Sequence, residues 1–578
     1  MVIRVWYNRR MAVKNIFLII IIIIAAAAPY INSMHNPFIW DEEEIIVKNP
    51  VIKDWSYLPH VFKTNIFGTA ITPSGYYRPM YTLSFMADYN IWGLNTFGYH
   101  LFNILFHVLN AILLYLLLMK LGLDRKIACF SSVLFAVYPI NCEAVTLIAA
   151  RVELIAGFLL LSCMICFING VKGRGLNFLL SIIFFALAML TKESVMVFPF
   201  ILLAYTLIFV EKKPGSKAIL PLMVLILMAA FYGIARFLLL GHSPVTTLSL
   251  INSASFIEKV FTLPGILFTY VSLILFPVRL ISEYDFVLRS FWDPRVWLAA
   301  FLLIAMFSAA YLRLKPKKYP LFFISWFLIS LAPYFNIIIP LHATLMEHWA
   351  YFSTMGFAAL SGIAVFNMAE SASSRWLKGL LILMAASLIG FYIAKITERN
   401  MEWSDPFRLY QADVKKEPNS FLLHCNLGVE YFRRGMTEEA EKEFLECNNV
   451  SPGGKYDTAC NNLGVIYARK GRTEEAIALY KESIDINNYP LAYENLGGLY
   501  NAMGKHRDAV LILEKGAELY PLNINILYQL GIAYYMNKEF GPAKQMFLRV
   551  EGIQKNYSDT AKFLNLLNNL TLQTLSQV

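Results

Sequence analysis

Residues 15–31 read NIFLIIIIIIAAAAPYI, a stretch without a single charge. A membrane-spanning helix needs roughly 20 mostly apolar residues, so this stretch predicts the first span. Arg4, Arg9, Arg10 and Lys14 precede it, and an excess of basic residues keeps a chain end on the inner side. The alanines at 25–28 also fit a signal-peptide cleavage site. We favour an uncleaved anchor because the chain soon enters another span.

The composition places the whole chain in the same class. The protein has 578 residues, of which 57% are hydrophobic and 16% charged. Soluble proteins contain about 45–50% apolar residues, so much of this chain is expected to face lipid. The net charge of +10 is typical of inside-facing Lys and Arg and does not indicate nucleic-acid binding.

Twelve apolar segments approach the length of a span. They lie at 15–31, 98–120, 126–142, 150–169, 175–191, 194–210, 218–240, 260–280, 295–312, 319–339, 347–368 and 376–395.

The basic loops define the expected topology. Loops with Lys120, with Lys172 and Arg174, and with Lys212 and Lys213 fall inside if the N-terminus is inside. Strict alternation of twelve spans would then place the basic cluster at 313–318 outside. One segment between 218 and 280 is therefore expected not to cross. This gives about eleven spans and an outside C-terminus.

The C-terminal part contains a repeat. Asn426-Leu427-Gly428 recurs with the same pattern around Gly464, Gly497 and Gly531, at spacings of 36, 33 and 34 residues. An Ala follows each repeat Gly after twelve residues. This is the tetratricopeptide pattern, whose period is about 34 residues. We expect about four helix pairs, with a leading half-repeat at 403–418 and a capping helix at 557–572. They bind an extended peptide or protein, or only stabilise the membrane part.

The fold is therefore predicted to be all-α. Residues 1–400 form a polytopic helical bundle with a first outside loop at 32–97, and residues 401–578 form a repeat solenoid.

That loop carries four consecutive acids, Asp41-Glu42-Glu43-Glu44, soon after the first span. A carboxylate there can take a proton from an acceptor hydroxyl while a lipid-linked donor reacts beside it. The alternative is an exposed acidic loop end. Further along the loop, Arg78 can bind a phosphate with its planar fork or anchor the chain at the membrane surface.

Other ionisable residues stand near span ends. His100 and His107 share one helical face, and we interpret them as hydrogen-bonded core residues rather than metal ligands. Glu143, Arg151 and Glu153 are candidate functional residues, because ionisable groups within the membrane are usually functional. The alternative is an internal Arg–Glu pair that holds two helices together.

Two later turns add charge. Lys192 can neutralise a phosphate or extend to the interface, and Glu347-His348 begins a late segment. No Gly-rich phosphate loop, HExxH or GxSxG is present, so nucleotide hydrolysis, zinc proteolysis and serine hydrolysis lack support. Cys163 and Cys166 have CxxC spacing, but an apolar setting favours packing over zinc or redox chemistry.

Taken in order, these pieces resemble the transmembrane and tetratricopeptide-repeat proteins. These are integral-membrane glycosyltransferases of the C superfamily, related to protein O-mannosyltransferases. The matching motifs are the acidic pair through Asn49, Tyr77-Arg78-Pro79-Met80, His100/Asn103/His107, Glu143-Ala144-Val145, Arg151-Val152-Glu153, Lys192-Glu193 and the segment from Met346 to Tyr351. Two positions depart from the family: Tyr138 replaces a His, and His348 replaces an Arg.

The resemblance implies the chemistry. Asp41 would be the general base, supported by Glu42, and a Ser or Thr hydroxyl would attack the anomeric carbon of a polyprenyl-phosphate hexose, such as mannose. Arg78, Arg151, Lys192 or His348 would stabilise the leaving phosphate. His100, Glu143, Glu153 and Glu347 complete the expected substrate-binding set.

The expected partners are the lipid-linked sugar, an acceptor protein on the repeats and membrane lipid, without nucleic acid. No cofactor is assigned, and the need for a divalent metal stays open. For a bacterial-type member the location is the inner membrane with periplasmic repeats; for a eukaryotic one it is the endoplasmic reticulum. A lipid-linked polysaccharide ligase or polymerase is an alternative, disfavoured by the short late outside loops. A membrane-anchored repeat scaffold is another, but it leaves the buried charges unexplained.

Overall fold

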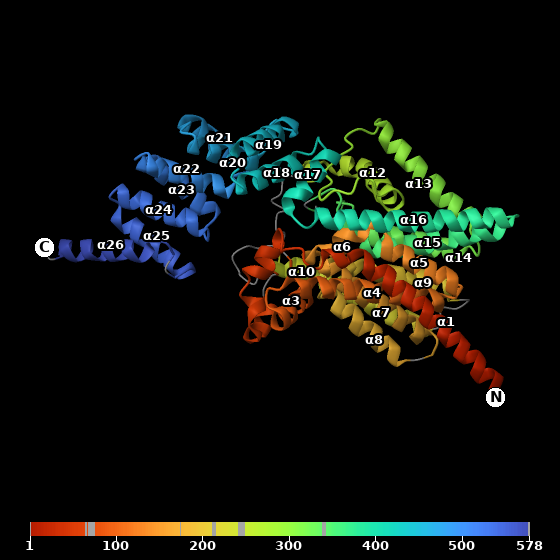
Figure 1. Ribbon diagram of the computed structural model, residues 1–578. Helices are drawn as coiled ribbons and strands as arrows, with labels where there is room; N and C mark the ends of the chain where they lie inside the picture. Colours follow the sequence, from red (N-terminus) through yellow and green to blue (C-terminus); the bar gives the residue numbers. More distant parts are fainter. Residues whose placement is uncertain are drawn as a thin grey trace. The chain divides into compact units, whose positions relative to one another are not determined.

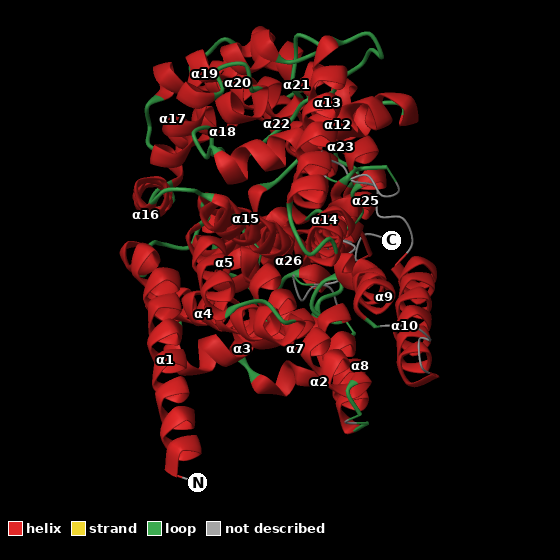
Figure 2. Ribbon diagram, turned by 90° about the vertical axis from the view of Figure 1, so that its right-hand side faces the viewer, coloured by secondary structure: helices red, strands yellow, loops and turns green. Residues whose placement is uncertain are grey.

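The computed structural model describes residues 2–63, 66, 76–173, 175–210, 216–240, 249–337, 341, 343–555 and 557–575. Arg174, Lys212 and Lys213, which carry part of the expected inside charge, lie outside the described residues, as does most of 64–75 in the first loop. The described chain consists of helices and loops, with one isolated bridge between Tyr284 and Leu345 (Figure 2). It divides into two compact units, 1–409 and 410–578.

The first unit is a helical bundle labelled in Figure 1. Its helices are α1 (Val2–Ala27), α2 (Leu58–Val61), α3 (Pro79–Trp92), α4 (Thr96–Leu121), α5 (Arg125–Val137), α6 (Cys142–Thr146), α7 (Arg151–Val171), α8 (Leu176–Met189), α9 (Phe198–Phe209), α10 (Ser216–Leu240), α11 (Leu250–Ser253), α12 (Phe256–Leu275), α13 (Pro294–Arg313), α14 (Lys318–Leu331), α15 (Tyr351–Ser371) and α16 (Arg375–Glu402). Short 3-10 or π turns join them, among them η1 (Ala28–Ser33), η2 (Glu43–Val47), η7 (Glu193–Val197) and η9 (Glu347–Ala350).

The bundle contains the helices of a multi-pass membrane protein. Among the described residues, eight helices are long and apolar enough to cross a membrane. There are nine if α5 and the bent segment after it, at 54°, form one span. Each of the twelve apolar segments overlaps a helix, but α8 and α14 have only 14 residues. At 1.5 Å per residue such helices are shorter than the roughly 30 Å hydrocarbon core, so the length criterion counts fewer spans than the eleven expected.

Two ends of the bundle are distinguished by their contacts. The end of α1 meets the end of α16, where the Asn400 side chain donates a 2.9 Å hydrogen bond to the Pro29 carbonyl oxygen. We call this the acidic end, since it also holds the loop with Asp41. The opposite, basic end carries the 313–318 cluster, beside which Tyr319 donates a hydrogen bond to the carbonyl oxygen of Leu121.

The segments that flank α12 meet one another, although the helix is long and apolar enough to span. Before it, the Leu250 amide donates to the Asp285 carboxylate, which follows the helix, at 2.9 Å. After it, the Ile281 amide donates to Glu347 at the acidic end, also at 2.9 Å. The chain on both sides of α12 therefore lies near the acidic end, and the expectation that one segment between 218 and 280 does not cross stays a prediction.

The second unit is a stack of helix pairs. Its helices are α17 (Pro406–Lys416), which starts in the first unit, α18 (Phe421–Arg433), α19 (Thr437–Val450), α20 (Asp457–Arg469), α21 (Thr473–Asn487), α22 (Pro490–Ala502), α23 (His506–Leu519), α24 (Ile524–Met536), α25 (Phe540–Ile553) and α26 (Thr560–Leu575).

The repeat glycines explain the close packing within each pair. A Cβ atom added at Gly464 would lie 2.7 Å from the Tyr480 ring, and one at Gly428 would lie 2.7 Å from the Phe444 ring. Only a glycine lets the second helix seat its aromatic ring at this distance. The pairs α18–α19 to α24–α25 form the four expected tetratricopeptide repeats.

Candidate active site

The first loop turns sharply at the acidic run. Trp40 has a φ of +53°, a left-handed conformation that is a true outlier for so bulky a residue. This turn points the next two acids in different directions. The Glu42 side chain is buried, and its two oxygens accept the amides of Ile39 and Ala149 at 2.9 and 3.0 Å. Asp41 is exposed.

The two acids therefore have different tasks. Glu42 fastens the loop to the chain before α7. Burial raises the pKa of Glu42 to about 8, against the lowering effect of its backbone hydrogen bonds. Asp41 is open to solvent, but nearby protein removes part of its hydration and, with the negative charge of Glu44, raises its pKa. A carboxylate with a raised pKa is a stronger base, which suits Asp41 to accept a proton.

Arg78 stands on the cationic side of the site. It is the residue before α3, and its fork holds Glu193 through Nη2–Oε1 and Nε–Oε2 distances of 2.7 and 3.1 Å. Arg236 of α10 approaches the same carboxylate, with Nη1 3.7 Å from Oε2. Arg236 was missed in the sequence, because a single Arg at the end of an apolar helix looks like an ordinary topology signal.

Tyr81 joins the acidic and cationic sides. Its hydroxyl donates to the carbonyl oxygen of Ala149 at 2.8 Å, and the amide of the same residue holds Glu42. Burial raises the pKa of the Tyr81 phenol; the positive charge of Arg78 opposes this rise, and the negative charges of Glu42 and Asp41 add to it. The acids of the first loop and Arg78 therefore act on one buried hydroxyl.

Arg151 does not face this site. Its side chain is fully buried and forms an ion pair with Asp88 of α3, whose side chain is also fully buried. It also donates to the Asn103 side chain and to the Tyr99 carbonyl oxygen, at 2.7 and 2.8 Å. These contacts hold α3 and α4 against α7. They give Arg151 an internal role in place of the expected contact with the donor phosphate.

Asp88 is thus the true partner of Arg151. The sequence suggested an Arg–Glu pair with Glu143 or Glu153, but Asp88 is 63 residues away along the chain. The run of mostly apolar residues around it on α3 was the available signal, because a buried acid requires a partner.

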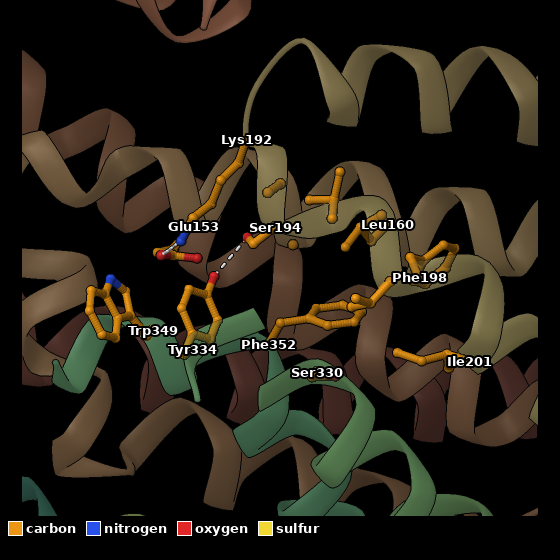
Figure 3. Close-up of a pocket in the computed structure, with 14 residues that line it drawn as sticks. Glu153, Leu160, Lys192, Ser194, Phe198, Ile201, Ser330, Tyr334, Trp349 and Phe352 are labelled. Atoms are coloured by element: carbon orange, nitrogen blue, oxygen red, sulfur yellow. Dashed lines mark hydrogen bonds and ion pairs between the residues drawn. The ribbon is translucent and has the colours of Figure 1, made fainter. Parts of the chain in front are cut away.

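Glu153 pairs with Lys192 in the lining of a cleft (Figure 3). Burial lowers the pKa of Lys192, and the Glu153 charge opposes this shift. The Lys192 ammonium lies 4.9 Å from the centre of the Tyr334 ring, which stacks on Trp349 at 5.1 Å.

The cleft has a polar end and an apolar end. Figure 3 shows Glu153 and Lys192 near Tyr334 and Trp349, with Leu160, Phe198 and Ile201 further along. The cavity itself has a volume of about 30 Å³, room for little more than a water molecule, so a larger ligand would enter only if the lining side chains moved.

A second acidic group lies where the late turn meets the second loop. The His348 amide donates to Glu143 Oε2 at 2.9 Å, and His348 Nδ1 lies 3.0 Å from the other oxygen of Glu143. Glu347 accepts hydrogen bonds from the Tyr284 hydroxyl and the Ile281 amide. Both glutamates are buried, so they connect segments far apart in the sequence.

The histidines of α4 are buried hydrogen-bonding groups. His100 Nε2 lies 3.1 Å from the carbonyl oxygen of Asn36, and His107 Nδ1 lies 2.8 Å from the Tyr351 hydroxyl. In the part of the chain that the structure describes, no group of three or more His, Cys, Asp or Glu side chains could hold a metal ion.

Known proteins match the two parts separately. Residues 79–235 match the family described as dolichyl-phosphate-mannose-protein mannosyltransferase, and residues 457–522 match the tetratricopeptide repeat. The chain is similar to protein O-mannosyl-transferases. A Caenorhabditis elegans protein O-mannosyl-transferase is 26% identical over 77% of this chain and 64% of its own length. Mouse protein O-mannosyl-transferase TMTC3 is 24% identical over 74% of this chain and 50% of its own.

The chain thus spans about half to two thirds of these relatives. The mannosyltransferase match runs from the start of α3 to residue 235 and includes Arg151 and Lys192. Among solved structures, the crystal structure of MamA covers 28% of this chain and 94% of its own, at 23% identity and a TM-score of 0.24. The repeat assignment rests on the sequence period and the helix pairs.

Proposed function

We propose that this protein is a membrane glycosyltransferase that moves a hexose from a polyprenyl-phosphate carrier to a Ser or Thr hydroxyl of a protein. The supporting observation is that one exposed base, Asp41, and the cation Arg78 both lie near the buried Tyr81 hydroxyl. By the names of its relatives the hexose is mannose.

The proposed reaction is a direct displacement. Asp41 takes the proton from the acceptor hydroxyl, and that oxygen forms the new bond to the anomeric carbon. The bond from this carbon to the phosphate oxygen breaks, and its electron pair leaves with the polyprenyl phosphate. The leaving anion needs nearby positive charge, which Arg78 and Lys192 supply.

Glu42 supports Asp41 by fixing the loop. Glu143, Glu347 and His348 join the second loop to the late turn that also carries Trp349. Trp349 and Tyr334 line the cleft with stacked rings, and such apolar faces can pack against a sugar or an isoprenoid. We place the lipid chain along Phe198 and Ile201.

The repeats are proposed to bind the acceptor protein on the same side of the membrane as Asp41. That side is the periplasm for a bacterial protein and the lumen of the endoplasmic reticulum for a eukaryotic one. Deleting 420–578 should leave transfer to a short peptide detectable and lower transfer to a full-length acceptor, provided the deletion variant inserts normally. Loss of both would give the repeats a part in the active site itself.

The direct test is a labelled-donor assay. Purified full-length protein is incubated with polyprenyl-phosphate mannose or glucose carrying a radioactive sugar, and with a Ser/Thr-rich peptide. Label should move to the peptide and be released by β-elimination. Label found in a glycan chain would favour the ligase or polymerase alternative, and no transfer with any donor would favour the scaffold.

A further inference from the structure

Tyr76 packs against the proposed phosphate-binding arginine. The Arg78 guanidinium carbon lies over the Tyr76 ring, 4.4 Å from the ring centre, which is a cation–π contact. The backbone of this segment is also held: the Tyr76 carbonyl oxygen accepts the Ile66 amide at 3.1 Å, and the Tyr77 hydroxyl donates to the Phe62 carbonyl oxygen at 3.1 Å. The first loop therefore sets the position of the ring, just before α3 begins.

Glu193 holds the same guanidinium by its edge. The two carboxylate oxygens accept hydrogen bonds from Arg78 Nη2 and Nε, at 2.7 and 3.1 Å. A two-point contact alone lets the guanidinium rock about the line through the two bonded nitrogens. The Tyr76 ring packed against it limits that motion. Arg78 is thus fixed by a carboxylate and a ring that come from different parts of the chain.

Arg78 keeps hydrogen-bond donors for a further group. A guanidinium has five N–H donors, and Glu193 takes two of them. The others have no hydrogen-bond partner in the part of the chain that the structure describes, and the Arg78 side chain is 14% exposed. These donors match phosphate oxygens, provided that the guanidinium is held in one orientation.

Tyr76 also lies near the proposed base. Burial raises the pKa of the Tyr76 hydroxyl; the positive charges of Arg78 and Arg236 oppose this rise, and the negative charges of Glu193 and Asp41 add to it. The ring therefore lies near both Asp41 and Arg78, the groups on which proton transfer and phosphate departure depend in the proposed reaction. A side chain in this place can fix where the phosphate lies relative to the base.

We propose that Tyr76 is a positioning residue: its ring, together with the Glu193 carboxylate, holds the Arg78 guanidinium in the orientation that binds the phosphate of the lipid-linked sugar. Tyr76 itself takes no part in proton transfer or bond breaking. The ring face carries this role and the hydroxyl does not, so Phe should replace Tyr76 and an aliphatic residue should not. The inference rests on the proposed function, because it takes the donor class from it.

The test compares two lipids that differ only in the phosphate. Full-length protein in nanodiscs is titrated with undecaprenyl phosphate and with undecaprenol, and the wild type should prefer the phosphate. Tyr76→Leu removes the ring face and should weaken phosphate binding by about fivefold, the size of a modest cation–π contact, while undecaprenol binding stays within about twofold. Tyr76→Phe keeps the ring and should bind both lipids like the wild type. Tyr57→Leu changes an exposed tyrosine of the same loop and is the matched control.

A double-mutant cycle shows whether Tyr76 acts through Arg78. Arg78→Lys keeps a positive charge for Glu193 but loses the planar group that packs against the ring. In that background, Tyr76→Leu should weaken phosphate binding by less than about twofold. The same loss as in the wild-type background would show that Tyr76 does not act through the arginine, and would overturn the inference.

The lipid titrations separate the two proposals. Equal wild-type affinities for the two lipids would refute the phosphate-linked donor of the proposed function, and this inference with it. If the wild type prefers the phosphate but Tyr76→Leu binds it as well as Tyr76→Phe does, only the role of Tyr76 is refuted. Equal loss of both lipids in Tyr76→Leu would show a structural role and refute it as well. If Tyr76→Leu fails to insert, Tyr76→Met, with a flexible apolar side chain, provides the same comparison.

Discussion

The ring of Trp403 meets the ring of Trp40 nearly edge to face, with the ring centres 5.0 Å apart. Trp403 follows the last helix of the bundle and is almost fully buried. Trp40 is the residue before Asp41 and holds the left-handed backbone conformation that separates Asp41 from Glu42. Such strain persists only where the surroundings enforce it. The end of α16 therefore helps to hold the turn that presents the proposed base.

We expect Trp403→Ala to lower kcat for sugar transfer by on the order of 10-fold, since small misplacements of a reacting group are costly. The KM for the lipid donor should change little, because Trp403 does not line the cleft. Trp403→Phe keeps an aromatic ring and should recover most of the rate. Trp376→Ala, an exposed tryptophan of the same helix, serves as control. Equal kcat values in the Trp403→Ala and Trp376→Ala variants would contradict the positioning role.

Asp41→Asn should reduce transfer by on the order of 100-fold or more, because the amide cannot accept the hydroxyl proton. Donor binding and membrane insertion should be unchanged. The matched control is Glu43→Gln, an exposed acid two residues further along, which should retain activity. Initial rates with labelled donor decide the outcome. If Asp41→Asn keeps full activity, the base must be sought elsewhere, and Glu143 would be tested next.

Asp88→Asn should destabilise the membrane unit by about 3–5 kcal/mol, because it leaves the buried Arg151 charge without its partner. Thermal unfolding in detergent measures the change. Glu398→Gln removes a partner from the more exposed pair with Lys395, and its effect should stay below about 1 kcal/mol. A small effect at Asp88 together with a loss of donor binding would restore Arg151 to the donor site.

The stability of the protein should depend on pH through Glu42. Its pKa is raised from 4.5 to about 8 in the folded protein, so the unfolded chain loses this proton first as the pH rises. Stability from this group is therefore fully present below about pH 4.5 and is lost as the pH rises to about 8. Glu42→Gln cannot titrate and should flatten this fall. Melting temperatures of both proteins across this range provide the check, and identical slopes would show that Glu42 is already ionised.

The repeats should lie on the same side of the membrane as Asp41. Asn400, at the end of α16, donates hydrogen bonds to the Pro29 carbonyl oxygen and the Asn32 side chain just before the Asp41 loop, and the repeat unit begins at Tyr410. A Lys505→Cys variant, beside Gly504 in the third repeat, should react with a membrane-impermeant thiol reagent in intact spheroplasts. The native cysteines are buried or half-buried, which limits background labelling. Protection of the new thiol until the membrane is opened would reverse this topology.

The sequence predicted those features that depend on local pattern. Gly428, Gly464, Gly497 and Gly531 recur at about the length of one helix pair, so their spacing indicated the repeats. The apolar stretches overlap the membrane helices because the tendency of a segment to enter lipid depends on its own composition and not on its partners. The position of Asp41 after the first span and the similarity to mannosyltransferases were likewise accessible from the chain.

The tertiary structure alone decided which charges pair with one another. Arg151, Lys192 and Arg78 look alike in sequence, as cations near the ends of apolar segments. In the fold, Arg151 is enclosed with Asp88, Lys192 meets Glu153, and Arg78 shares Glu193 with Arg236 from α10. The partners of the hydrogen-bonded pairs Arg78–Glu193, Arg151–Asp88 and Lys192–Glu153 lie 39 to 115 residues apart in the chain. A buried charge must find an opposite charge, but its own sequence neighbourhood does not specify which helix supplies it. Packing of the whole bundle makes that choice, and with it determines which cations remain near the cleft.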